Sequence, residues 1–259
     1  MTHKHEKEMH MQTEFIGKSA IVTGSSEGIG FALAKGLVDA GARVLLVARR
    51  EDVVRKAAEG LGPNAAWIAV DLTEEGAEEK VVRAAIDRHG GIDYLVNNAG
   101  LNLPAFIGDY RASDFRRMVD LNMVSTTMLT QAAVPYLAAG DGSAILNIST
   151  GGSRKATIGN GLYSATKIAI NYLTEVWALE LADRGIRVNC ICPGGTETPQ
   201  FCKVADSIEG YREMVIGVTP VKRMCAPEEL VHSAFLLLSK RTGGFITGAI
   251  LDADGGYHI

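Results

Sequence analysis

Long apolar runs are absent from this sequence. No stretch approaches the roughly 18 uninterrupted apolar residues that mark a membrane-spanning helix. The first fourteen residues, MTHKHEKEMHMQTE, also lack the apolar core of a secretory signal peptide. We therefore expect no membrane partner and a cytoplasmic location. Residues 1–14 are predicted to form a disordered polar tail.

The sequence also lacks a strong charge of either sign, an internal repeat and a break in composition. Its formal net charge is -4, which gives no support for a nucleic-acid partner. The 259 residues are 47% hydrophobic, enough for a sizeable core. Because nothing divides the chain, residues 15–259 are predicted to form one domain.

Metal-binding and disulfide patterns are missing as well. The three histidines of the tail have no cysteine or aspartate partners, so no metal site is predicted. Without a secretory signal, the four cysteines are expected to be reduced thiols. Cys190 and Cys192 lie in a strand-like run and are interpreted as buried small hydrophobes. The cysteines are Cys190, Cys192, Cys202 and Cys225.

Short apolar runs alternate with helical patterns along the whole chain. The alternation and the continuous apolar character of the runs predict a doubly wound α/β domain with a mainly parallel seven-stranded sheet. Such sheets bind ligands at the carboxyl ends of their strands. The expected strands are Ser19–Thr23, Arg43–Val47, Ala66–Val70, Tyr94–Asn97, Ala144–Ile148, Arg187–Ile191 and Ala249–Leu251. The expected helices are Ile29–Ala40, Asp52–Glu59, Glu75–His89, Asp114–Ala138, Leu162–Ala182 and Pro227–Leu238.

One segment breaks this alternation. About thirty residues after Pro193, at roughly 194–223, contain no strand pattern, and insertions of this length usually carry function. We predict that this segment is a lid over the substrate.

Tyr163 and Lys167 stand four residues apart within a helical pattern. On a helix this spacing returns both side chains to one face, about one turn (~6 Å) apart. A neighbouring ammonium favours the phenolate, so Lys167 is predicted to lower the pKa of Tyr163 from its usual value near 10. A tyrosine adjusted in this way can act as a general acid or base. Many surface helices carry the pair by chance, so the other motifs decide its meaning.

A glycine-rich turn, Thr23–Gly30, directly follows the first expected strand. Its glycines at 24, 28 and 30 allow a tight turn and close backbone approach, and the following helix begins with unpaired N–H groups that attract anions. The turn therefore favours pyrophosphate binding over a purely structural role.

These motifs occur in the order and spacing of the short-chain dehydrogenase/reductase family, which the chain resembles from Gly17 to Gly256. The resemblance implies a one-domain Rossmann-like fold, binding of NAD(P)(H), hydride transfer on an alcohol or carbonyl, and a homo-oligomer, either a tetramer or a dimer. The further motifs that carry it are Asn97-Asn98-Ala99-Gly100, Asn122 and Pro193-Gly194-x-x-x-Thr198.

The resemblance also implies the catalytic roles. Tyr163 becomes the acid/base, Lys167 lowers its pKa and holds the nicotinamide ribose, and Asn122 anchors a water that relays protons. The family usually places a serine thirteen residues before the tyrosine, where this chain has Thr150.

Threonine offers the same donor and acceptor as serine, although its methyl group stiffens the side chain. We assign the polarisation of the substrate oxygen to Thr150, with Ser149 or Ser153 as alternatives.

Cofactor preference is predicted from the end of the second strand. NAD-preferring relatives place an acidic residue where Ala48 stands, whereas Arg49 can bind a 2′-phosphate bidentately. Glu27 argues mildly the other way, but a close arginine should outweigh a more distant glutamate. We therefore expect NADP(H) rather than NAD(H).

The full set of expected cofactor-binding residues comes from the same resemblance. Within it, Asp71 would contact the adenine or cap a helix, and Thr198 would bind the nicotinamide carboxamide. The set is Gly24, Ser26, Glu27, Gly28, Ile29, Gly30, Arg49, Arg50, Asp71, Leu72, Asn98, Ala99, Gly100, Tyr163, Lys167, Pro193, Gly194, Thr196 and Thr198.

The sequence thus predicts an NADP(H)-dependent oxidoreductase acting on a small-molecule carbonyl or secondary alcohol. The alternatives are a cofactor-binding protein without catalysis and an NAD-dependent alcohol dehydrogenase of the same family. Four basic residues near the expected pocket could favour an acidic substrate but are more simply interpreted as surface charges: Arg154, Lys155, Lys203 and Arg212.

Overall fold

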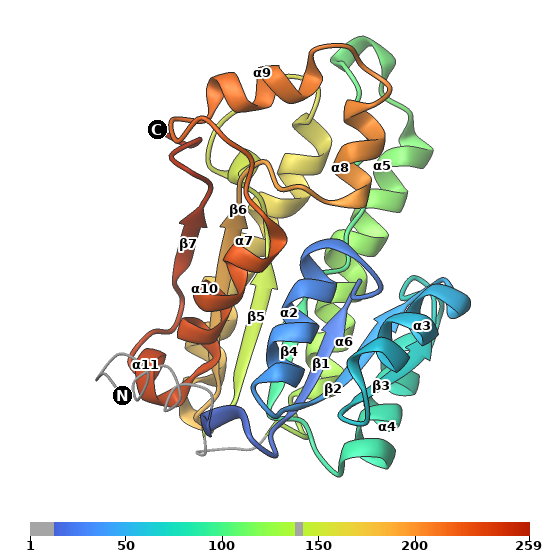
Figure 1. The fold of residues 1–259 in the computed structure, drawn as a ribbon, viewed down its shortest axis with the longest axis vertical. Helices are drawn as coiled ribbons and strands as arrows, with labels where there is room; N and C mark the ends of the chain where they lie inside the picture. Colours follow the sequence, from blue (N-terminus) through green and yellow to red (C-terminus); the bar gives the residue numbers. More distant parts are fainter. Residues whose placement is uncertain (1–12, 138–141) are drawn as a thin grey trace.

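The computed structural model describes residues 13–137 and 142–259. Seven strands form one sheet in the order β3-β2-β1-β4-β5-β6-β7, with every pairing parallel (Figure 1). The predicted doubly wound α/β fold with seven strands is confirmed. The strands are β1 (Ser19–Thr23), β2 (Arg43–Ala48), β3 (Ala65–Ala69), β4 (Tyr94–Asn97), β5 (Ala144–Ile148), β6 (Arg187–Pro193) and β7 (Ile250–Ala253).

Helices cover both faces of the sheet and make three layers. Helices α2, α3 and α10 pack on one face, and α4, α6 and α7 on the other. The helices are α2 (Gly28–Asp39), α3 (Glu51–Leu61), α4 (Ala77–His89), α5 (Ala112–Val119), α6 (Ser125–Ala133), α7 (Gly161–Leu181), α8 (Pro199–Ala205), α9 (Tyr211–Val218), α10 (Leu230–Leu238) and α11 (Lys240–Gly243). Short 3₁₀ turns lie at Thr13–Phe15, Ile107–Asp109, Gly151–Ser153, Ala182–Arg184 and Pro227–Glu229.

A hydrophobic core lies on each face of the sheet, and alternate side chains of the central strands pack into one core or the other. On β1, Ala20 and Val22 pack into the core under α2, while Ile21 packs into the core under α4 and α6. All residues of β1, β4, β5 and β6 are buried, which explains why these strands appear in the sequence as continuous apolar runs.

The predicted helix Asp114–Ala138 is not continuous. It is divided into α5, a π-helical turn at Asp120–Val124, and α6, and its predicted last residue lies outside the described part. The wider turn contains Asn122, whose buried side chain bonds away from the helix, to Leu101 and Thr166. π turns are uncommon in proteins, and those that occur often lie at functional sites.

The segment at 194–223 contains no strand, as predicted, but it is not irregular. It forms α8 and α9, which lie beyond the carboxyl ends of β5 and β6 (Figure 1). The rings of Phe201 and Tyr211 join the two helices, with centroids 5.7 Å apart, and an ion pair links Arg212 to Glu197. Its action as a lid stays a prediction.

The predicted tail of residues 1–14 lies mostly outside the described residues. Its last two residues do not fit the prediction, because Thr13 and Glu14 belong to a 3₁₀ turn. The Glu14 carboxylate accepts hydrogen bonds from the Ser239 hydroxyl and the Arg241 amide, which ties this turn to α11. No helix among the described residues is long and apolar enough to cross a membrane.

Candidate active site

A cleft of about 330 Å³ opens at the carboxyl ends of the strands, beside the N-terminus of α2. It brings together fourteen of the nineteen predicted cofactor-binding residues. These are Gly24, Ser26, Glu27, Gly28, Ile29, Arg49, Arg50, Leu72, Asn98, Ala99, Gly100, Tyr163, Lys167 and Thr198.

The glycine-rich turn leaves no room for larger residues. A Cβ atom on Gly30 would lie 2.4 Å from both Asn98 Nδ2 and the Gly24 oxygen, and one on Gly24 would lie 2.9 Å from Ala99 Cα. The β1–α2 turn and the β4 end therefore touch through their backbones. Asn98 completes the contact by donating from Nδ2 to the oxygens of Thr23 and Gly24, at 2.9 and 3.0 Å.

The N-terminus of α2 faces the cleft without an internal cap. Glu27 precedes the helix but makes no side-chain bond to it, and Gly28 has a φ of +61°, which favours glycine. The first N–H groups of the helix and its dipole are thus available to an anion.

Two arginines line the cleft beside this turn, and each faces a carboxylate. Arg49 Nη1 lies 3.7 Å from Asp71, and Arg50 Nη2 lies 2.8 Å from Glu27. Both guanidinium groups are more than half exposed. Partial burial of Asp71 opposes ionisation, but hydrogen bonds from Thr73 and the charge of Arg49 outweigh it and lower its pKa.

Asp71 caps no helix, because its oxygen accepts from Thr73 and α4 begins only after Gly76. The predicted alternative, that Asp71 caps a helix, is therefore wrong.

Asn122 is 1% exposed and bonds within the protein through all its amide atoms. Its oxygen accepts from the Leu101 amide at 2.7 Å, while its nitrogen donates to the Leu101 oxygen and the Thr166 hydroxyl. The residue therefore pins the loop after Gly100 against α7. The contact of Asn122 with a water stays a prediction. Its side-chain oxygen has a second lone pair, which none of these contacts uses and which is available to a water.

Tyr163 and Lys167 lie on one face of α7 and both line the cleft, as predicted. The electrostatic prediction is wrong for the protein alone. Burial raises the pKa of Tyr163 to about 12, and a hydrogen bond with Thr150 only partly opposes this. Burial also lowers the pKa of Lys167 to about 8, and its Nζ donates to the Ile148 oxygen at 2.8 Å. Desolvation is the largest cause of both shifts, and it acts against the charged form of each group.

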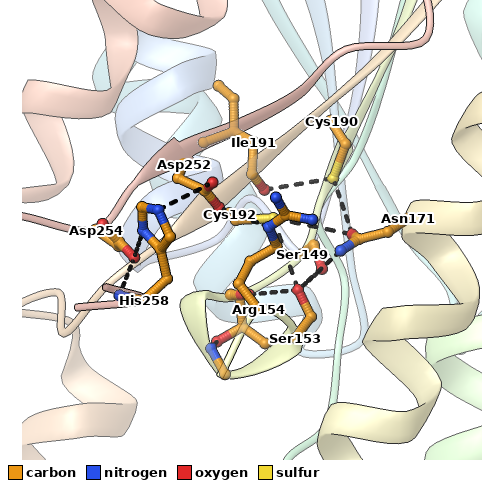
Figure 2. A network of polar contacts seen from close by, with 12 residues as sticks. Ser149, Ser153, Arg154, Asn171, Cys190, Ile191, Cys192, Asp252, Asp254 and His258 are labelled. Carbon is orange, nitrogen blue, oxygen red and sulfur yellow. Dashed lines mark hydrogen bonds and ion pairs between the residues drawn. The ribbon is translucent and has the colours of Figure 1, made fainter. Parts of the chain in front are cut away.

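Ser149 and Thr150 directly follow β5 and differ in their contacts. Thr150 contacts Tyr163 and also caps the following 3₁₀ turn, accepting from the Gly152 amide at 3.3 Å. The Ser149 hydroxyl is buried and lies 3.2 Å from Ser153 Oγ (Figure 2). It also lies 3.2 Å from the Lys167 main-chain oxygen. Ser149 lines the cleft and Thr150 does not, but the Ser149 hydroxyl is engaged with α7 and the turn.

Comparison with known proteins agrees with this arrangement. The family described as enoyl-(acyl carrier protein) reductase matches residues 24–258. The 2,5-dichloro-2,5-cyclohexadiene-1,4-diol dehydrogenase LinX of Sphingobium indicum is 31% identical over 96% of this chain and 99% of its own length. The 3-oxoacyl-[acyl-carrier-protein] reductase FabG of Thermotoga maritima is 32% identical over 94% of this chain and 98% of its own.

A mammalian relative and a solved structure extend the comparison. The L-fucose dehydrogenase of Mus musculus is 35% identical over 95% of this chain and 90% of its own. The crystal structure of the Brucella melitensis 3-ketoacyl-(acyl-carrier-protein) reductase, complexed with NADH, superposes with a TM-score of 0.88. It is 30% identical and covers 95% of this chain and 100% of its own.

The chain belongs to the short-chain dehydrogenase/reductase family. It is a dehydrogenase or reductase acting on alcohol or carbonyl groups, and its fold binds a nicotinamide cofactor. The residues of the cleft fit such a cofactor. At the N-terminus of α2 the backbone is so closely packed that a Cβ atom on Gly30 has no space. The Lys167 ammonium lies 3.3 Å from the point where a Cβ atom on Gly100 would stand.

Five residues assigned to the cofactor lie outside the wall of the cleft. Gly30 and Asp71 are next in sequence to residues of the wall. Pro193 is the last residue of β6, and Gly194 and Thr196 follow it. A Cβ on Gly194 would meet the Asp254 backbone at 2.7 Å, and the Thr196 hydroxyl donates to the Gly194 oxygen. Their binding roles stay predictions.

Seven wall residues were missed, most of them next in sequence to a residue that the sequence singles out. Their signal was their position alone, because apolar and amide side chains carry no motif. They are Val47, Val70, Asn102, Leu121, Ile148, Pro199 and Gln200, whereas Ala48 and Ser149, which also line the cleft, are singled out in the sequence for cofactor preference and the substrate oxygen.

Three of the four basic residues near the expected substrate pocket are already engaged. Arg154 pairs with Asp252, Arg212 pairs with Glu197, and Lys155 donates to main-chain oxygens at 257 and 259. These three are therefore not the unpaired surface charges that the sequence suggested, because each is engaged with a carboxylate or a main-chain oxygen. The four cysteines are free thiols, and Cys190 and Cys192 are buried, as expected.

Proposed function

We propose that the protein is an NADP(H)-dependent oxidoreductase that moves hydride between nicotinamide and a carbonyl or secondary alcohol. The observation that carries this proposal is that Tyr163 and Lys167 both line the cleft built by the glycine-rich turn, with Thr150 hydrogen bonded to the Tyr163 phenol. When bound, the cofactor supplies or accepts the hydride. The remaining chemistry, a proton at the substrate oxygen, falls to the protein.

Tyr163 is the residue for that proton. Its raised pKa keeps the phenol protonated at neutral pH, so it can donate a proton to a carbonyl oxygen that receives hydride. The Thr150 hydroxyl, which contacts the phenol, orients the same oxygen. Lys167 is charged below its pKa of about 8 and presents donors suited to ribose hydroxyls.

The preference for NADP(H) is supported by the side chains at the end of β2. Ala48 offers no carboxylate to repel a 2′-phosphate, and Arg49 and Arg50 both line the cleft. Glu27, which argued for NAD(H), is paired with Arg50, so its charge is largely compensated locally.

The function is tested in two steps. Titration with NADPH and NADH, followed by cofactor fluorescence, measures both dissociation constants. A screen then follows NADPH oxidation with ketones, 3-oxoacyl thioesters, cyclic ketones and oxidised sugars, the chemical classes suggested by the relatives. Tight NADPH binding with turnover of no carbonyl, and no reverse oxidation of alcohols, would instead support the alternative of a non-catalytic cofactor binder.

We also propose that the chain forms a homo-oligomer. Three apolar residues on one face of α7, Ile168, Tyr172 and Leu179, are 51%, 67% and 81% exposed. Spaced by four and seven residues, they form a stripe suited to pack against a second copy. Light scattering on the purified protein gives the molecular mass, and Leu179→Glu should shift it toward that of the monomer. The cytoplasmic location stays a prediction.

A further inference from the structure

The end of the chain lies against the loop that follows Thr150. Residues 254–259 form one side of this contact and residues 151–160 the other. The hydroxyls of Tyr257 and Thr157 are 2.7 Å apart. Lys155 Nζ donates to the main-chain oxygens of Tyr257 and Ile259, at 3.0 and 3.1 Å, and lies 5.3 Å from the centre of the Tyr257 ring.

A second set of contacts holds the base of the same loop. Arg154 Nε lies 3.3 Å from Asp252 Oδ1, on β7 (Figure 2). Gly151 is buried, and a Cβ placed on it would stand 3.2 Å from the Tyr257 ring and 3.3 Å from Asp254 Cβ. The loop and the terminal segment are thus packed together as well as hydrogen bonded.

The terminal segment is itself organised around Asp254, which is 4% exposed. Its carboxylate accepts from the amides of Gly256 and His258 and lies 2.9 Å from His258 Nδ1 (Figure 2). Asp252, Asp254 and His258 could in principle ligate a metal ion. His258 already contacts both carboxylates, and Asp252 also pairs with Arg154, so the three residues link the terminal segment to the loop.

The loop is short of regular structure, and its position is coupled to that of Thr150. It opens with Gly151-Gly152, and glycines lose the most conformational freedom on ordering. Its first turn is built on Thr150, whose hydroxyl accepts from the Gly152 amide and whose main-chain oxygen accepts from the Ser153 amide. Displacement of the loop would therefore displace Thr150.

We propose that residues 254–259 are a clamp that positions the Thr150 loop for the reaction, with Tyr257 and Lys155 as its positioning residues. The proposal rests on the proposed function for the role of Thr150. The contacts themselves can be tested without activity, so the two proposals can fail separately.

Hydrogen exchange measured by mass spectrometry on the full chain tests the clamp directly. Tyr257→Phe removes the hydroxyl and keeps the ring, and amides in the peptide covering 151–160 should then exchange about 5-fold faster, the effect of one lost hydrogen bond. Thr157→Val should match it, Thr157→Ser should restore wild-type exchange, and the double variant Tyr257→Phe/Thr157→Val should be no faster than either single one. Peptides of α2 should not change.

Two control variants remove similar groups elsewhere: Tyr136→Phe after α6 and Lys56→Met on α3, both exposed. They should leave exchange in 151–160 unchanged, whereas Lys155→Met should accelerate it. Equal exchange in wild type, Tyr257→Phe and Thr157→Val overturns the clamp.

The kinetic test uses the carbonyl compound that the screen shows to be reduced fastest. Tyr257→Phe should lower kcat/KM for the carbonyl about 5-fold, with the dissociation constant of NADPH unchanged and Thr157→Ser close to wild type. A purely structural contact would leave kcat/KM unchanged or would weaken NADPH to the same extent, and either result overturns the positioning role.

Discussion

The two halves of the site are held in different ways. On the cofactor side, the chain approaches itself so closely around Gly24 and Gly30 that a Cβ atom on either glycine would clash with Gly24, Asn98 or Ala99. On the substrate side, the contacts join side chains distant in sequence, such as Thr157 with Tyr257 and Arg154 with Asp252. The two glycine positions have no space for a side chain, whereas the contacts of the second half depend on which side chains are paired.

This difference explains what each half can be used for. A glycine cradle binds a part common to many ligands, because the main chain offers the same N–H groups in every relative. Paired side chains give each chain its own pocket walls. We therefore expect substrate choice to depend on the loop at 151–160, the segment at 194–223 and residues 254–259, which the motifs do not describe.

The largest effect is expected at the residue where the two halves meet. Tyr163→Phe should lower kcat by roughly 10²–10⁴-fold, because it deletes the group that transfers the proton. NADPH affinity, measured by fluorescence titration, should remain within about 3-fold of wild type, since the ring stays in place. Retention of more than about a tenth of the wild-type turnover would remove Tyr163 from the reaction.

The next effect separates two neighbouring residues on the substrate side. Thr150→Val keeps the shape and deletes the hydroxyl, so kcat should fall about 100-fold, the usual loss of one oriented donor. Thr150→Ser should stay active and Ser149→Ala nearly so, because the Ser149 hydroxyl is engaged with Lys167 and Ser153. The reverse order in steady-state kinetics would transfer the role to Ser149.

A smaller effect is expected at the edge of the cofactor side. Arg49→Ala should weaken NADPH by about 10- to 100-fold, the loss of one charge-assisted contact, and NADH much less. Arg55→Ala, which removes an exposed arginine on α3 outside the cleft, is the matched control. Ala48→Asp should shift the preference further toward NADH. Equal weakening of both cofactors would show that Arg49 acts only through general electrostatics.

The smallest effect concerns the stability of the whole fold, and we expect it to affect the two halves of the site equally. Burial, helped by Arg43 and Arg88, lowers the pKa of His89 from 6.5 to about 4. Between these values the unfolded chain binds more protons than the folded one, so the free energy of unfolding should fall as the pH drops from 6.5 to 4.

Urea denaturation at several pH values measures the slope, and His89→Gln should flatten it. His232→Gln, at an exposed position on α10, should not change the slope. An unchanged slope in His89→Gln would assign the acid sensitivity to other groups.

The sequence predicted the features that depend on local rules. Strands β1, β4 and β5 have the expected bounds, because buried parallel strands are continuous apolar runs with clear ends. The Tyr163–Lys167 face and the glycine cradle follow from helical spacing and backbone geometry in the same way.

What could not be predicted depends on burial and on distant partners. The pKa of Tyr163 rises because desolvation exceeds the effect of the hydrogen bond with Thr150, and the spacing from Lys167 does not reveal how deeply the phenol is buried. The π turn at Asn122 requires knowledge that Leu101 and Thr166 lie beside it. The engagement of Arg154 and Lys155 depends on a chain end about one hundred residues away.

The strand order also governs how this chain must assemble. β1 pairs on one side with β2, which follows closely, and on the other with β4, whose partner residues begin some seventy positions later, as Ala20 and Tyr94 show. Until β4 arrives, the open edge of β1 exposes apolar residues and unpaired backbone groups. Closing so long a loop is slow, and such edges are prone to aggregation. The strand pairing that creates the cleft between β1 and β4 has the longest separation in sequence of the sheet, so we expect it to slow folding more than the other pairings.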